Sequence, residues 1–129
     1  MGTMMTASTA YLERWTRIGE QAARARAVPM NRLIALVIVV FYNAVGLADV
    51  ASTVQAINLG AVEVNPMMRS VMEAIHHYWI APKLAGHLLV SAMILWFPHR
   101  FVLALFAAAA LTNFAVVLNN YQIVTHLAG

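Results

Sequence analysis

Three ionisable side chains, those of Asp49, Lys83 and His87, lie within long apolar segments of the sequence. An ionisable group in hydrocarbon is costly, so it normally faces protein or water and often marks a functional site. If the two segments are antiparallel helices, Asp49 and Lys83 come to similar depths, and His87 lies one helical turn from Lys83 on the same face. We therefore predict a buried ion pair between Asp49 and Lys83, with His87 and either Asn119 or Asn120 completing its hydrogen bonds.

Further polar residues would join this ion pair in one layer of the molecule. Asp49 and Thr53 share a stripe of mostly small residues on their helix, and such a stripe lets a neighbouring helix approach closely. Glu63 and Asn65 fall in the turn just above that layer. The predicted polar cluster, as a binding or intramembrane site, consists of Asp49, Thr53, Glu63, Asn65, Lys83, His87, Asn119 and Asn120.

The same cluster has a purely structural alternative. Lipid provides no hydrophobic drive between helices, so polar side chains often cross-link them, and each bond contributes roughly 0.6–2 kcal/mol. The sequence leaves both interpretations of the cluster open. Asn43 and Asn113, near mid-depth, are predicted to serve in packing rather than in chemistry.

Metal chemistry finds little support in the residue types. The chain has no cysteine, which excludes thiolate metal sites, disulfides and cysteine nucleophiles. Glu73 and His76 have the Glu-x-x-His spacing of di-iron bundles, but such sites need two of these motifs and two further carboxylates. His76 and His77 diverge by about 100° on a helix, and methionines beside them are more typical of packing than of copper binding. We predict no metal site, and the sequence identifies no cofactor.

No catalytic motif accompanies the polar cluster. A hydrolase of the Ser–His–Asp type would need a nucleophile near His87 and Asp49. The hydroxyls nearest to them in the sequence are those of Ser52, Thr53 and Ser91. The chain contains no nucleophile elbow, phosphate-binding loop or dinucleotide fingerprint. An intramembrane enzyme that uses Glu63 with the same layer stays open, although the sequence favours a protein without enzymatic activity.

The composition places these polar residues in a membrane protein. Of 129 residues, 62% are hydrophobic and 10% are charged, and the mean hydropathy is +0.73. A soluble domain is about half apolar and a quarter charged. A chain this short cannot bury such an excess of apolar surface inside itself, so a bilayer must solvate its outside. The sequence therefore indicates an all-α chain that is integral to a membrane.

Residues 1–30 are predicted to form a cytoplasmic amphipathic segment that precedes the membrane domain, residues 31–126. At about 100° per residue, apolar side chains gather on one side of a helix over residues 11–25, with polar and charged ones opposite. A basic helix with Trp and Tyr on its apolar face is typical of the headgroup layer of a membrane. A solvated tail is the alternative. Pro29 ends this segment, and Asn31 is the predicted N-cap of the next helix.

Three apolar segments are long enough to span a membrane. They cover residues 33–58, 79–97 and 101–124. Between the first two, the sequence predicts a short helix over residues 67–78, with Asn65 as its N-cap and Pro66 in its first turn. This helix is too short and too charged to span, so we expect it to be interfacial or re-entrant. The predicted fold is a bundle of three transmembrane helices, preceded by the amphipathic helix.

The basic residues predict an orientation in the inner membrane. One side of the predicted membrane domain carries Arg14, Arg17, Arg24, Arg26, Arg32 and Arg100. Arg69 lies in the opposite loop, and Lys83 falls within the second span. Since loops rich in Lys and Arg stay in the cytoplasm, the N-terminus is predicted to be cytoplasmic and the C-terminus to lie outside.

The order of the polar residues also resembles that of a known family. The pattern consists of Asp49, Thr53, Gly60, Glu63, Asn65, Pro66 and Lys83. Over about residues 33–124 it resembles a family of small bacterial and archaeal membrane proteins that share a domain of unknown function. The resemblance implies a membrane protein that uses these polar positions. It implies no particular activity.

The sequence favours an accessory or structural subunit of a larger membrane complex, because three helices enclose little volume and no soluble domain is present. Its expected partners are the lipid bilayer and other membrane subunits or copies of itself, with no nucleic acid. One alternative is an oligomeric transporter that moves protons or a small ion past Asp49, Lys83 and His87. The other alternative is the intramembrane enzyme.

Overall fold

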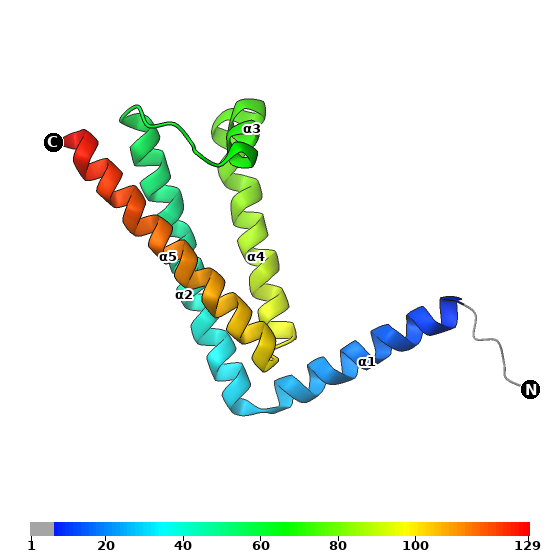
Figure 1. The fold of residues 1–129 in the computed structure, drawn as a ribbon. Coiled ribbons are helices and arrows are strands. Elements are labelled where there is room, and N and C mark those ends of the chain that lie inside the picture. The colour runs from blue at the N-terminus through cyan, green and yellow to red at the C-terminus, as the bar shows by residue number, and fades with distance from the viewer. Residues whose placement is uncertain (1–6) are drawn as a thin grey trace, which may run out of the picture.

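The computed structural model describes residues 7–129, and the predicted all-α fold class is confirmed (Figure 1). Its helices are α1 (Ala7–Ala27), α2 (Pro29–Asn58), α3 (Pro66–Ile75), the short 3-10 helix η1 (His76–Trp79), α4 (Ile80–Trp96) and α5 (Arg100–Ala128). α2, α4 and α5 form the bundle, and α1 extends away from one end of it. We call that end the base, and the opposite end, where α2 leads into α3, the turn end.

Three stretches of helix are long and apolar enough to cross a membrane. They are Pro29–Asn58, Pro66–Trp96 and Arg100–Ala128, with 30, 31 and 29 residues. Their outward surface is strongly apolar, as Leu47, Leu88 and Leu89 illustrate with exposures of 60–68%. Water would not favour such a surface, whereas the ~30 Å hydrocarbon core of a bilayer would solvate it. The chain is therefore an integral membrane protein with three candidate spans.

The helices α1 and α2 are separated by Val28 alone. Val28 has an extended backbone (φ −84°, ψ 112°) and Pro29 follows it in the first turn of α2, as expected because proline disfavours a helical residue before it and suits the first helical position. The prediction that Asn31 caps α2 is wrong, because the helix begins before that residue. The Asn31 amide instead donates to the carbonyl of Ala25 at 3.2 Å, which links the end of α1 to α2.

The short helix after the turn begins as predicted and ends earlier. Asn65 is its N-cap, since its side-chain oxygen accepts the backbone N–H groups of Met67 and Met68 at 3.0 and 3.4 Å. The helix was predicted to continue through residue 78, but α3 ends at Ile75. His76 has a positive φ of 52°, which is uncommon for a residue other than glycine and interrupts the helix before α4.

The helices converge on an apolar core near the base. Ala35 of α2, Ile94 of α4 and Leu103 of α5 are buried together. Residues packed against them are Ile38, Val39, Val90 and Phe106. Helices α2 and α5 stay together toward the turn end, whereas α4 diverges from them (Figure 1). The bundle is therefore tightly packed at the base and open at the turn end.

A set of contacts at the base attaches α1 to the bundle. Ala22 and Ala25 are buried, and the guanidinium of Arg26 donates to the backbone carbonyl of Trp96 at the end of α4. The same guanidinium lies over the Trp96 ring, 5.7 Å from its centroid, in a cation–π arrangement. These contacts hold the C-terminal part of α1, and its N-terminal part extends beyond the bundle (Figure 1).

Candidate functional site

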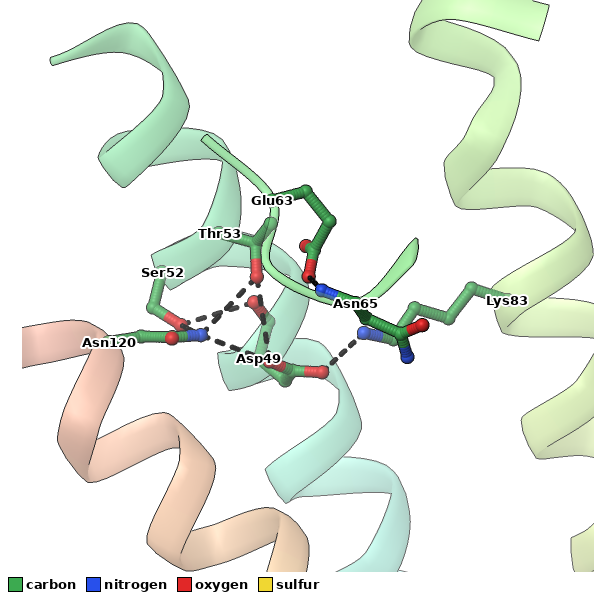
Figure 2. Close-up of polar contacts among 7 residues, drawn as sticks. All are labelled: Asp49, Ser52, Thr53, Glu63, Asn65, Lys83 and Asn120. Atoms are coloured by element: carbon green, nitrogen blue, oxygen red, sulfur yellow. Dashed lines mark hydrogen bonds and ion pairs between the residues drawn. The ribbon is translucent and has the colours of Figure 1, made fainter. Parts of the chain in front are cut away.

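Asp49 is the centre of a hydrogen-bonded network that joins three helices (Figure 2). Its carboxylate lies on α2, and Thr53, one helical turn further, donates to Oδ1 at 3.5 Å. Lys83 reaches from α4 and donates from Nζ to Oδ2. Asn120 reaches from α5 and donates from Nδ2 to Oδ1 at 3.2 Å. Both carboxylate oxygens therefore have partners, and each neighbouring helix supplies one of them.

The predicted ion pair between Asp49 and Lys83 is confirmed and is largely buried. The side chain of Lys83 is 18% exposed and that of Asp49 is 13% exposed. The Lys83 ammonium also lies 5.9 Å from the ring centroid of Trp79, within range of a cation–π interaction. Since an isolated charge in this environment would cost several kcal/mol, each member of the pair offsets part of the cost of burying the other.

Ser52 belongs to this network, although the sequence analysis did not include it in the cluster. It is fully buried, and its hydroxyl donates to the backbone carbonyl of Asp49 at 3.1 Å. The Asn120 amide nitrogen lies 3.2 Å from the Ser52 Oγ and 3.3 Å from the Thr53 Oγ1. The spacing of three residues from Asp49 was the available signal, because residues i and i+3 share a helix face.

Asn120, and not Asn119, completes the hydrogen bonds of the ion pair. Adjacent residues on a helix point about 100° apart, so the rotation of α5 allows one of them to face Asp49. The side chain of Asn120 is half-buried in the network, whereas Asn119 is exposed and lines the cleft described below.

The expectation that His87 would complete the ion pair is wrong. Its ring is buried and stacks on that of Tyr42, with centroids 4.3 Å apart and planes 27° apart. Its Nδ1 atom has no hydrogen-bond partner within residues 7–129. The ring lies so close to Gly46 that a Cβ atom there would collide with it. His87 thus fills the space between α2 and α4 below the ion pair.

The turn between α2 and α3 is closed by its own hydrogen bonds. The Glu63 carboxylate accepts the backbone N–H of Asn65 at 2.9 Å. The Arg69 guanidinium donates twice to the backbone carbonyl of Glu63, at 2.9 and 2.7 Å. The turn therefore holds Glu63 and Asn65 in fixed positions above the ion pair (Figure 2).

A cleft of about 560 Å³ opens between these elements at the turn end. All eight residues of the predicted polar cluster line it, from α2, the turn, α4 and α5. Asn113 lines it as well. Asn43, by contrast, has the predicted packing role, because its amide donates to the Ser91 hydroxyl at 2.7 Å and so joins α2 to α4.

The cleft has the chemistry of a binding site. Its volume lies within the ~300–1,000 Å³ range of small-molecule pockets. Charged groups from Asp49, Lys83 and Glu63 line it together with several amides. Within residues 7–129, no three His, Cys, Asp or Glu side chains are grouped so that they could hold a metal ion. The described groups could instead hold a polar ligand through hydrogen bonds and charge.

Searches against protein-family models, curated proteins and solved structures found no match to this chain. The resemblance to small membrane proteins that share a domain of unknown function therefore stays a prediction from the motif alone.

The ion pair predicts a specific pattern of stabilities. Asp49→Asn or Lys83→Met alone should lower the free energy of unfolding by about 3–5 kcal/mol, because each leaves an uncompensated buried charge. The double variant should recover part of that loss. Unfolding in detergent, monitored by the loss of helix content, would give the free energy of unfolding of the wild type, the two single variants and the double variant. Single effects that simply add would mean that the two charges do not interact.

Gly46 predicts a second coupling, with His87. Gly46→Ala should destabilise the protein by about 1–3 kcal/mol, because the added methyl group overpacks the contact with the imidazole ring. His87→Ala should remove most of this penalty in the double variant. The matched control is Gly86→Ala, since a Cβ there meets nothing within 4 Å. An equal loss of stability in Gly46→Ala with and without His87 would contradict the contact.

Proposed function

We propose that this protein is an accessory subunit of a larger inner-membrane assembly, and that it contributes the cleft as a site for a polar ligand or partner group. The observation that carries this proposal is the division of the bundle into two halves. The polar side chains of the predicted cluster line the cleft at the turn end. Ala35, Ile94 and Leu103 fill the interior near the base. The chain thus has a place to hold a polar group.

The same division favours binding over transport through a single copy. A path for protons or ions across the membrane needs polar groups or water along its whole length. Between the cleft and the base, the interior of the bundle contains the Asn43–Ser91 hydrogen bond and then the apolar core. Transport would have to follow a route between copies of the chain.

The hydrogen bonds of the carboxylates give less support to an intramembrane enzyme. Asp49 accepts from Lys83, Asn120 and Thr53, so its oxygens are already engaged. Glu63 accepts a backbone N–H through one oxygen, and its second oxygen is the better candidate for a general base. An enzyme of this kind would need Glu63 for activity while folding without it.

Our proposal places the base on the cytoplasmic side of the inner membrane. Arg32 and Arg100 lie in the first turns of α2 and α5, at the base, where α1 with its arginines is attached (Figure 1). Arg69 lies near the turn end. Since Lys and Arg accumulate in cytoplasmic loops, the cleft would open toward the outside.

This orientation predicts that the C-terminus lies outside. A pair of reporters fused after Gly129, one active only in the cytoplasm and one active only outside it, would measure the topology in cells. We expect activity from the outside reporter alone, because α5 leads from the base to the turn end. Activity of the cytoplasmic reporter alone would reverse the proposed orientation.

A pull-down from membranes in mild detergent, analysed by mass spectrometry, tests the proposed function. The tagged chain should recover one or more membrane proteins in stoichiometric amount, and Asp49→Asn should reduce both its own abundance and that recovery. Leu89→Ala, at an exposed apolar position, is the matched control and should change neither. A chain that recovers no partner, and whose Asp49→Asn variant keeps its abundance but loses ion flux in liposomes, would instead be a transporter.

A further inference from the structure

One face of α1 is buried at the C-terminal end of the helix and exposed at the N-terminal end. Tyr11, Trp15, Ala22 and Ala25 lie on the same side at about 100° per residue. Ala22 and Ala25 are buried near the base, whereas Tyr11 and Trp15, further along the helix, are 60% and 53% exposed. The two exposed rings pack edge to face, with centroids 5.9 Å apart. The apolar face is thus only half covered by the chain itself.

The covered half fixes the direction in which the exposed half points. Ala22 and Ala25 are buried where α1 meets the base of the bundle, so this face is turned toward the candidate spans. A straight helix keeps one face on one side, and α1 continues outward from the base (Figure 1). Tyr11 and Trp15 therefore point to the same side as the spans, which is the side where the hydrocarbon of a bilayer would lie.

The attachment of α1 makes this direction a fixed property of the protein. The Arg26 contacts with Trp96 connect α1 to α4, and the hydrogen bond from Asn31 to Ala25 connects it to α2. The hinge at Val28 is a single residue before a proline, which has a fixed φ. Rotation of α1 about its own axis would break these contacts.

The opposite face of α1 is charged, and at about 100° per residue it carries Glu13, Arg17, Glu20 and Arg24. The helix as a whole has a net positive charge. Between residues 7 and 27 the helix has four arginines and two glutamates. The ion pair between Arg17 and Glu13, at 3.7 Å, joins two well-exposed side chains, so it contributes little and leaves the guanidinium available to other anions. A helix of net positive charge, with aromatic residues on one face and charged residues on the other, is suited to the boundary between headgroups and acyl chains.

We propose that α1 binds the surface of a bilayer rich in anionic phospholipids, with Tyr11 and Trp15 in the acyl region and Arg14, Arg17 and Arg24 among the lipid phosphates. The occupant of this face is thus the leaflet around the base of the bundle. Charge complementarity supports an anionic leaflet, since α1 has four arginines against two glutamates and a negative membrane surface attracts Lys and Arg side chains. This inference does not depend on the proposed function, because it concerns the opposite end of the molecule from the cleft.

The absence of cysteine from the sequence allows a direct test in the full chain. Tyr11→Cys on the apolar face and Glu20→Cys on the polar face are each given one spin label. Both positions are exposed, so the labels should leave folding unchanged, which thermal unfolding would check. The proteins are placed in nanodiscs of phosphatidylcholine, with or without phosphatidylglycerol. Collisions of each label with oxygen, which dissolves in lipid, and with a water-soluble nickel complex are measured by paramagnetic resonance.

In anionic nanodiscs, the label at position 11 should collide several-fold more with oxygen than with nickel, and the label at position 20 should show the reverse. A variant with Arg14, Arg17 and Arg24 changed to Gln should lose the difference between anionic and neutral lipid. Equal nickel access at both labels would overturn the proposal. So would protection at position 11 that is the same in both lipids, or that requires two chains per nanodisc and therefore reports a second copy.

Discussion

The carboxylate of Asp49 is the constraint on which the arrangement of the helices depends. A charge that is 13% exposed between apolar helices costs several kcal/mol unless opposite charge and hydrogen-bond donors surround it. Lys83 from α4 and Asn120 from α5 meet this need. Apolar contacts alone would fix the helices less well, because lipid solvates an apolar face about as well as another helix does. One side chain thus relates the depth and rotation of three helices.

The length of the Lys83 side chain explains how α4 can be linked to α2 at the turn end while a cleft remains between the helices. Small buried residues such as Ala56 and Ala110 let α2 and α5 lie close together. α4 is packed tightly against α2 from His87, which contacts Gly46, to Ile94, which is fully buried near the base. At the turn end its link to α2 passes through the Lys83 stem, which bridges the space between the helices (Figure 2). A shorter cation would require α4 to approach Asp49, and the cleft would shrink.

Depth and composition were enough to predict that there are three candidate spans, the ion pair and eight of the residues that line the cleft, because these depend on position along helices of known rise. The rotation of each helix about its axis, and the choice of a side chain between two available contacts, were not predictable in this way. The choice between Asn119 and Asn120 depends on how α5 packs against α2, which buries Val117. His87 could face Asp49 or the small surface at Gly46, and it packs there against Tyr42. Asn31 was a plausible cap until Pro29, with its preset φ, began the helix earlier.

The turn end of the bundle must give water access to polar side chains, whereas the base must provide apolar packing. The position of the cleft follows from this difference. Amides such as Asn113 and Asn119 line the cleft without being enclosed in a packed core. Such groups are stable only where water or a polar ligand can reach them, because unsatisfied polar groups in hydrocarbon cost several kcal/mol each. A cleft that opens at the end of the spans and reaches inward to Asn113 meets this condition. The apolar core near the base then carries the packing that the open end cannot provide, and α1 is attached to this more rigid half.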